Sequence, residues 1–242
     1  DGTLLNGESK VDVATAKAIQ TLKNNGYEPF IATGRSSAET RDIMESANIH
    51  SGIFMNGQVV LYQGKRVYSS EIPTEMVKKF HQMVKEDGYG FTAYNDKEFY
   101  LVESTDGAKD AYGFIHTNPP ALNADFYIDN PINMLLFICL PPAEEKYKVA
   151  FPNLDFLRNT PYSVDMISKG NSKAEGIKRF LEYLNQEDAE TYAFGDGPND
   201  IEMLQAVTHP VAMGNAIPVL KELAEFITTN NTDNGIINGL KH

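Results

Sequence analysis

The sequence has 242 residues and a formal net charge of −12, and 42% of its residues are hydrophobic. This length and hydrophobic content allow one large domain, or a core with a smaller inserted domain, around a well-buried interior. The acidic balance disfavours nucleic acid and anionic membranes as partners, and no apolar stretch is long enough to span a bilayer. The single cysteine, Cys139, lies in the apolar segment INMLLFICL, which predicts a buried thiol and is typical of a cytoplasmic protein.

The first part of the chain alternates predicted helices and strands. A helix is predicted over residues 11–25, because apolar side chains recur along one of its faces. These side chains are Val13, Ala16, Ile19 and Leu22. A strand over 27–34, a helix over 36–49 with one of its first two serines as N-cap, and a short buried strand over 52–57 follow. Such alternation indicates a parallel sheet covered by helices.

The middle of the chain has a different pattern, which indicates an α+β unit. Hairpins turn at Gln63–Gly64 and at Asn95–Asp96, and the helix between them has an apolar face. The predicted elements are a hairpin over 59–72, a helix over 73–88, a hairpin over 89–103, a helix over 104–116, a buried strand over 132–140 and a helix over 141–151. Pro141 and Pro142 are expected in the first turn of the last helix.

The third part returns to alternating helices and strands. Its predicted elements are a helix over 172–185, a strand over 191–197, a helix over 199–207, a strand over 209–215, a helix over 217–224, a strand over 226–231 and a short last helix. We therefore predict a discontinuous α/β core over residues 1–62 and 162–242. An α+β domain over 63–161 is inserted into this core.

Four short stretches fall at the ends of predicted core elements, where a parallel sheet binds its ligands: DGT, TGR, SKGNSK and GDGPND. Each has an ordinary structural alternative, as a turn, a helix cap or a solvated lysine. Thr33 and Gly34 are expected at a helix start, where a hydroxyl and free N–H groups hold phosphate oxygens. Lys173 opens a helix, an unfavourable place for a cation unless it faces an anion. The carboxylates of Asp196 and Asp200 suit Mg²⁺, whereas Pro198 disfavours a calcium loop.

Together, in this order and around an insertion, the four stretches resemble the motifs of the haloacid dehalogenase (HAD) superfamily of phosphatases. The insertion is similar to the class IIB cap of the Cof-type sugar-phosphate phosphatases, and the resemblance covers essentially the whole chain. It implies a Rossmann-like parallel-sheet core, an inserted α+β cap and a bound Mg²⁺. It also implies a small phosphate ester as substrate, and no protein partner is evident.

The resemblance implies a role for each matching residue. Asp1 takes the place of the general acid/base, and its backbone carbonyl is expected to contact Mg²⁺. Thr33 and Lys173 match the groups that hold the transferring phosphoryl group, with Lys169 as a nearby alternative to Lys173. Further expected roles are a metal ligand at Asp196, a phosphate contact at Asn199 and a second metal carboxylate in the outer shell at Asp200. Substrate contacts are also expected from Gly34, at the predicted helix start, and from Asn56, because it ends a core strand just before the cap.

The nucleophilic aspartate of this family is expected two positions before Asp1, ahead of the printed sequence. We expect the protein to carry it on a preceding hydrophobic strand, and the measured intact mass would test this. Without that strand, covalent catalysis is impossible. Cap-side candidates for contact with the leaving group are Tyr94, Asn95, Tyr112, His116 and Asn133, each of which is also compatible with a packing role.

The predicted function is a Mg²⁺-dependent phosphomonoester hydrolase that acts on small phosphorylated metabolites, with sugar phosphates as the expected class, through an aspartyl-phosphate. Metal and lysine together would offset the repulsion between a carboxylate nucleophile and a phosphate dianion. A phosphomutase on the same fold, or a non-catalytic phosphosugar-binding protein, remains an alternative.

Overall fold

The computed structural model describes residues 1–115 and 117–241, which form two compact units. The first comprises residues 1–35, 39–68 and 172–242, and the second comprises 36–38 and 69–171. These divisions differ from the predicted boundaries after residues 62 and 161. The reason is that β4 (Lys65–Ser69) belongs to a sheet of the first unit, whereas β9 (Ser163–Ser168) belongs to the sheet of the second.

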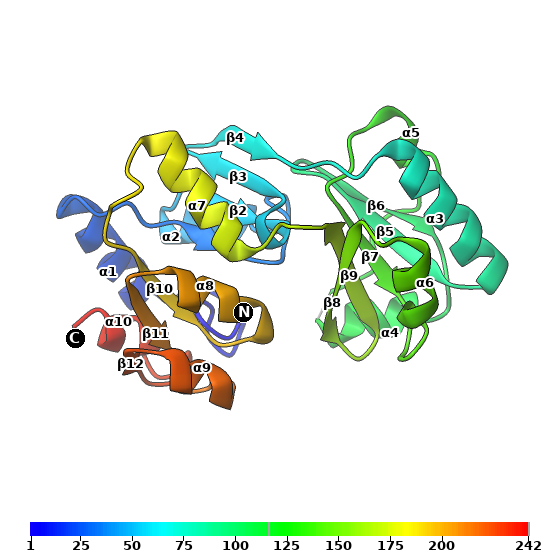
Figure 1. Ribbon diagram of the computed structural model, residues 1–242. Helices are drawn as coiled ribbons and strands as arrows, with labels where there is room; N and C mark the ends of the chain where they lie inside the picture. Colours follow the sequence, from blue (N-terminus) through cyan, green and yellow to red (C-terminus); the bar gives the residue numbers. More distant parts are fainter. Residues whose placement is uncertain (116, 242) are drawn as a thin grey trace. The chain divides into compact units, whose positions relative to one another are not determined.

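One sheet of the first unit has the strand order β1-β2-β3-β4. Its strands are β1 (Ile31–Ala32), β2 (Gly52–Phe54), β3 (Val59–Tyr62) and β4. The first pair is parallel, with Ile31 opposite Gly52, and the next pair is antiparallel, with Phe54 opposite Val59. The helix α7 (Lys173–Leu184) packs on β2 and β3 (Figure 1). Gly176 permits this close approach, because a Cβ there would lie 2.4 Å from Cγ2 of Ile53.

The other sheet of the first unit is parallel and has the order β10-β11-β12. Its elements are β10 (Tyr192–Gly195), α8 (Ile201–Ala206), β11 (His209–Ala212), α9 (Pro218–Leu223), β12 (Phe226–Ile227) and α10 (Gly235–Gly239). Buried apolar residues of α7, α8, α9 and both sheets form one core cluster. This arrangement confirms the predicted alternation of strands and helices and brings the carboxyl ends of β10, β11 and β12 to one edge.

The first two helices are shorter than predicted. The helix α1 (Val13–Asn24) buries Thr15 and Ile19, but Val13, expected on its buried face, is 88% exposed because it opens the helix. The helix α2 (Arg41–Ala47) does not begin at Ser36 or Ser37. Thr40 is its N-cap residue, and the preceding residues form turns.

The second unit is a five-stranded antiparallel sheet with helices, and its strand order is β6-β5-β7-β9-β8. Its elements are α3 (Thr74–Asp87), β5 (Gly90–Tyr94), β6 (Phe99–Glu103), α4 (Ala108–Phe114), α5 (Phe126–Asp129), β7 (Met134–Ile138), α6 (Glu144–Ala150), β8 (Leu154–Thr160) and β9. The predicted hairpins at residues 63–64 and 95–96 and the apolar face of α3 are confirmed. Phe80 of α3 is fully buried and contacts the rings of Phe91, Phe137, Tyr147 and Phe151.

The hairpin of β8 and β9 was not predicted from the sequence, although two runs rich in β-branched and apolar residues flank Pro161 and Tyr162. The predicted helix over 141–151 begins only at Glu144, so both prolines precede it. No described helix has both the length and the apolar character that a bilayer span requires.

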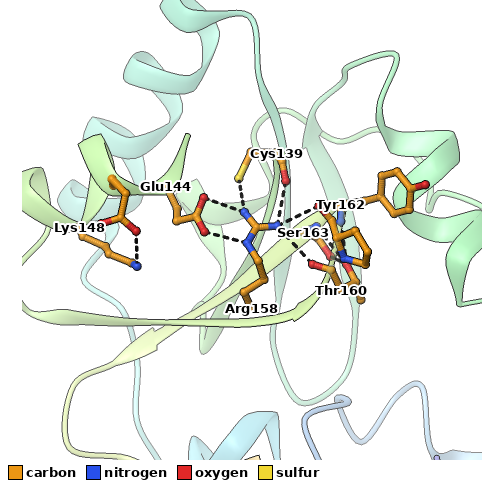
Figure 2. Close-up of polar contacts among 9 residues, drawn as sticks. Cys139, Glu144, Lys148, Arg158, Thr160, Tyr162 and Ser163 are labelled. Atoms are coloured by element: carbon orange, nitrogen blue, oxygen red, sulfur yellow. Dashed lines mark hydrogen bonds and ion pairs between the residues drawn. The ribbon is translucent and has the colours of Figure 1, made fainter. Parts of the chain in front are cut away.

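A half-buried arginine joins the hairpin of β8 and β9 to α6 (Figure 2). Arg158 donates to both carboxylate oxygens of Glu144 at 2.7 and 2.8 Å, and to the main-chain carbonyls of Cys139, Thr160 and Pro161 at 3.1 to 3.2 Å. Its Nη2 lies 3.4 Å from Sγ of Cys139, whose predicted burial is confirmed. Burial raises the pKa of the Cys139 thiol to about 11. This cluster therefore stabilises the second unit, and burial favours the protonated thiol although Arg158 acts in the opposite direction on its pKa.

Candidate active site

The segment at the start of the chain lies against the loop after β10. The hydroxyl of Thr3 donates to Oδ1 of Asp196 at 2.5 Å. Gly2 has φ +68°, and a Cβ there would lie 2.1 Å from Oδ2 of the same carboxylate. Only glycine combines this left-handed backbone with so close an approach. Two motifs separated by nearly the whole chain are therefore in direct contact.

Two asparagines also bind the segment at the start of the chain. Asn215 follows β11, and its Nδ2 donates to the carbonyl of Gly2 at 2.8 Å. Asn231 follows β12 and donates through its backbone N to Oδ1 of Asn215 at 3.0 Å, and through Nδ2 to the carbonyl of Leu5 at 2.7 Å. Sequence reasoning did not identify these residues, although both follow parallel strands at the edge where such sheets bind ligands.

The loop between β10 and α8 is organised by a buried carboxylate. Oδ2 of Asp200 accepts from the backbone N atoms of Asp196 and Gly197 at 2.9 and 3.0 Å. Its Oδ1 accepts from Nζ of Lys173 at 2.6 Å, and these two side chains are only 6% and 7% exposed. The anion that this lysine at the start of α7 faces is therefore Asp200. Both oxygens of that carboxylate are engaged.

The alternative lysine, Lys169, has different contacts. It is an exposed residue of the second unit, and its Nζ donates to the carbonyl of Pro152 at 3.4 Å. Lys173 instead follows Ser172, the N-cap of α7, whose side chain accepts from the backbone N of Glu175. Of the two lysines, Lys173 is therefore the one that contacts the GDGPND loop.

Thr33 and Gly34 follow β1 but do not open a helix, which corrects the sequence prediction. The helix α2 begins only at Arg41, because turns occupy the residues between. The dipole of α2 is therefore not available at Thr33. The Thr33 hydroxyl instead accepts from the backbone N of Arg35 at 3.1 Å, and the backbone N of Thr33 donates to the carbonyl of Ile53.

Arg35, which sequence reasoning did not single out, binds the carboxylate of Asp1. Its Nε lies 2.9 Å from Oδ2, and its Nη2 lies 2.7 and 2.6 Å from Oδ1 and Oδ2. Such a two-point contact fixes the orientation of a carboxylate as well as its charge. The place of Arg35 as the last residue of TGR is the signal that could have identified it.

Asn199 and Asn56 form a side-chain pair. Nδ2 of Asn199 donates to Oδ1 of Asn56 at 3.1 Å, although the two residues are 143 positions apart in the chain. Asn56 is 1% exposed and follows β2 within a tight turn. Both residues were predicted to contact the substrate, and the structure brings them together in the first unit.

The electrostatics of Asp196 differ from those of a surface aspartate. Burial raises the pKa of the Asp196 carboxyl, the hydrogen bond from Thr3 opposes this, and the charge of Asp200 adds to it. A cation beside this carboxylate would offset the cost of burying its charge. Within residues 1–115 and 117–241, no three His, Cys, Asp or Glu side chains cluster as a metal site. A metal held at Asp196 would therefore need backbone, substrate or water oxygens as well, as Mg²⁺ commonly does.

Four of the cap-side candidates have internal partners. The hydroxyl of Tyr112 lies 2.9 Å from that of Tyr94. Oδ1 of Asn95 accepts from the backbone N atoms of its own turn, and Nδ2 of Asn133 donates to Ser69 and Ser70. Contact of these residues with a leaving group stays a prediction. His116 lies outside the described residues.

Comparison with known proteins identifies the family. Residues 1–240 match the family model of haloacid dehalogenase-like hydrolases. The chain belongs to this family. It is 35% identical over 243 residues to "Putative phosphatase YkrA" of Bacillus subtilis, an alignment that covers 100% of this chain and 94% of that protein.

Solved structures of similar proteins have the same fold. A hypothetical protein from Geobacillus kaustophilus superposes with a TM-score of 0.93 at 31% identity, covering 100% of this chain and 94% of the other. The HAD subclass IIB sugar phosphatase BT4131 superposes with a TM-score of 0.86 at 27% identity, covering 100% and 95%. The predicted Cof-type HAD phosphatase, with a Rossmann-like core and an inserted α+β cap, is therefore confirmed.

Proposed function

We propose that this HAD phosphatase is a Mg²⁺-dependent phosphomonoester hydrolase that acts on small phosphorylated metabolites in the cytoplasm. Sugar phosphates are the substrate class we favour, because one structural relative is named a sugar phosphatase. The observation that carries the proposal is the direct contact of three motifs from distant parts of the chain: Thr3 with Asp196, and Asp200 with Lys173.

The oxygen-only donor set supports Mg²⁺ as the metal. The Asp196 carboxylate and the backbone carbonyl of Asp1 would hold it, with Asp200 acting from outside the inner shell because both its oxygens are engaged. When bound, the ion would supply positive charge that screens the substrate phosphate from the carboxylates. Lys173 supplies a second positive charge in the site. These two charges would allow a protein of net charge −12 to bind an anionic substrate.

In the proposed reaction, the aspartate expected two positions before Asp1 attacks phosphorus, and the bond from phosphorus to the ester oxygen breaks. The Asp1 carboxyl gives its proton to the departing alkoxide, which leaves as the alcohol. Asp1 then takes a proton from water, whose oxygen attacks phosphorus as the bond to the aspartate breaks and inorganic phosphate leaves. Arg35 binds the Asp1 carboxylate that the first transfer leaves and orients it as the base for the second.

Phosphate release from a panel of sugar phosphates tests the proposal. The full-length protein should release inorganic phosphate with Mg²⁺, lose this activity in EDTA and regain it when excess Mg²⁺ is added. Phosphate release that EDTA does not affect would contradict the proposed dependence on Mg²⁺. An isomerised sugar phosphate without release would indicate a phosphomutase, and binding without turnover would indicate a phosphosugar-binding protein.

Two variants localise the chemistry. Asp196→Asn should abolish Mg²⁺-dependent release, because the amide cannot balance a divalent charge. The control Asp233→Asn makes the same change at an exposed position and should leave release unchanged. Equal activity of the two variants would refute the assignment of Asp196.

A further inference from the structure

The turn between β2 and β3 has an unusual backbone. Met55, Asn56 and Gly57 have φ values of 50°, 54° and 94°, so three successive residues are left-handed. Glycine and asparagine tolerate this region, whereas a long side chain such as methionine rarely adopts it. All three residues are buried. An unfavourable conformation persists at such a place only where the surrounding structure enforces it.

The backbone of this turn contacts two of the motifs. The N atom of Met55 donates to the carbonyl of Arg35, and that of Asn56 donates to the carbonyl of Thr33, each at 3.0 Å. A Cβ on Gly57 would lie 2.1 Å from the carbonyl oxygen of Ser172, the residue before Lys173. The turn therefore packs against both TGR and the start of α7.

The side chain of Asn56 reaches a third motif. Its Oδ1 accepts from Nδ2 of Asn199 at 3.1 Å, and the residue is 1% exposed. The left-handed backbone decides which way this side chain leaves the turn. The structure thus directs the amide oxygen of Asn56 at the GDGPND loop.

We infer that Asn56 is a positioning residue, which fixes the side-chain amide of Asn199 for contact with the substrate phosphate. The inference rests on the proposed function, in which Asn199 makes that contact. An amide group with one N–H held by a buried acceptor cannot rotate freely, so its second N–H keeps one direction. Asn56 therefore acts through Asn199 and not on the substrate itself.

A double-mutant cycle on phosphate release tests this role. Asn56→Ala should lower kcat/KM about fivefold to tenfold, the range expected when one hydrogen bond is lost. The loss should fall mainly on kcat, because a misoriented Asn199 amide weakens its contact with the phosphate most in the transition state, where charge develops. In an Asn199→Ala background, the same substitution should change kcat/KM by less than about twofold, since the contact through which we infer it acts is already absent.

A second variant distinguishes the effect of backbone strain from the effect of the lost hydrogen bond. Asn56→Gly favours the left-handed backbone but lacks the acceptor, so it should unfold at a higher temperature than Asn56→Ala and be as poorly active. Asn185 is left-handed at the exposed end of α7, with φ 53°. Asn185→Ala should therefore lose stability through its backbone while retaining wild-type kcat/KM.

Wild-type activity in Asn56→Gly, or an equal effect of Asn56→Ala with and without Asn199, would overturn the inference. A readout independent of turnover is the side-chain amide resonance of Asn199, assigned by its loss in Asn199→Ala. This resonance should shift in Asn56→Ala and Asn56→Gly but not in Asn185→Ala. If the wild type releases no phosphate, the proposed function fails. The resonance still decides whether Asn56 positions Asn199, and an unshifted resonance would refute that.

Discussion

Asp200→Asn should destabilise the first unit by about 3 kcal/mol. The substitution removes the negative partner of Lys173, whose side chain is 7% exposed and lies 2.6 Å from the carboxylate. Breaking a buried ion pair on one side costs about 3–5 kcal/mol, because the remaining charge is left without compensation. We expect the lower end of that range, since the amide oxygen of asparagine still accepts from the backbone N atoms of Asp196 and Gly197.

Urea unfolding at pH 7 measures this loss. The chain contains no tryptophan, so far-ultraviolet circular dichroism is the suitable signal. With a slope of about 2 kcal/mol per molar urea, the midpoint of the first unit should fall by about 1.5 M. Adding Lys173→Met to Asp200→Asn should recover much of the loss, because the uncompensated charge is then removed.

A matched control is the exposed pair on α7. Glu182→Gln removes the partner of Lys178 at 4.0 Å, where the side chains are 50% and 65% exposed, and should cost less than about 0.5 kcal/mol. A loss below about 1 kcal/mol in Asp200→Asn would show that Lys173 is compensated in another way. The reasoning from burial would then be wrong.

Three further predictions concern other contacts of the chain. Gly2→Ala should lower kcat/KM about 100-fold, because its Cβ would lie 2.1 Å from Oδ2 of Asp196 and displace that carboxylate. Cys139, with a pKa of about 11, should resist a thiol reagent at pH 8 until the protein is unfolded, when it should react at once. Arg158 lowers the pKa of Glu144, so the pair stabilises the fold above the unfolded glutamate pKa of about 4.3, and this contribution is lost as the pH falls through the lower folded pKa. The difference in unfolding free energy between wild type and Glu144→Gln should therefore be full at pH 7 and shrink on acidification.

A specific result would contradict each of these predictions. Gly26 has φ +88°, and no atom lies within 4 Å of the place a Cβ would take, so Gly26→Ala shares the backbone cost without the collision and should keep full activity. An equal loss of kcat/KM in both glycine variants would show that the backbone cost, and not the collision with Asp196, causes the effect. Rapid native labelling of Cys139 would show that its burial is transient. A Glu144→Gln difference that does not change with pH would exclude a role for the carboxylate charge.

The alternating elements of the core and the α+β character of the insertion could be predicted from the sequence. Their apolar side chains follow the helix or strand period, and this pattern is local. The face of α3 that packs on the second sheet is an example, since Val77, Phe80 and Val84 are all buried. The β8 and β9 hairpin was missed although its pairing is local, with Thr160 opposite Ser163. Sequence spacing does not reveal that β9 also pairs with β7.

The residues of the candidate site were likewise predicted only in part from the sequence. Asp1, Lys173 and Asp196 were indicated by the resemblance that the four stretches carry together in their order, because each stretch alone also suits a turn, a helix cap or a solvated lysine. Asn215 and Asn231 carried no such signal, since an asparagine after a strand is common in turns.

The sequence by itself determined the residue types of the site, the order of its motifs and the family to which they point. Tertiary structure decided which of these side chains meet. Thr3 contacts Asp196, Lys173 contacts Asp200, and Asn199 contacts Asn56 across distant parts of the chain. Hydrogen bonds and ion pairs act over a few ångströms, so only the packing of the strands and α7 could select these partners.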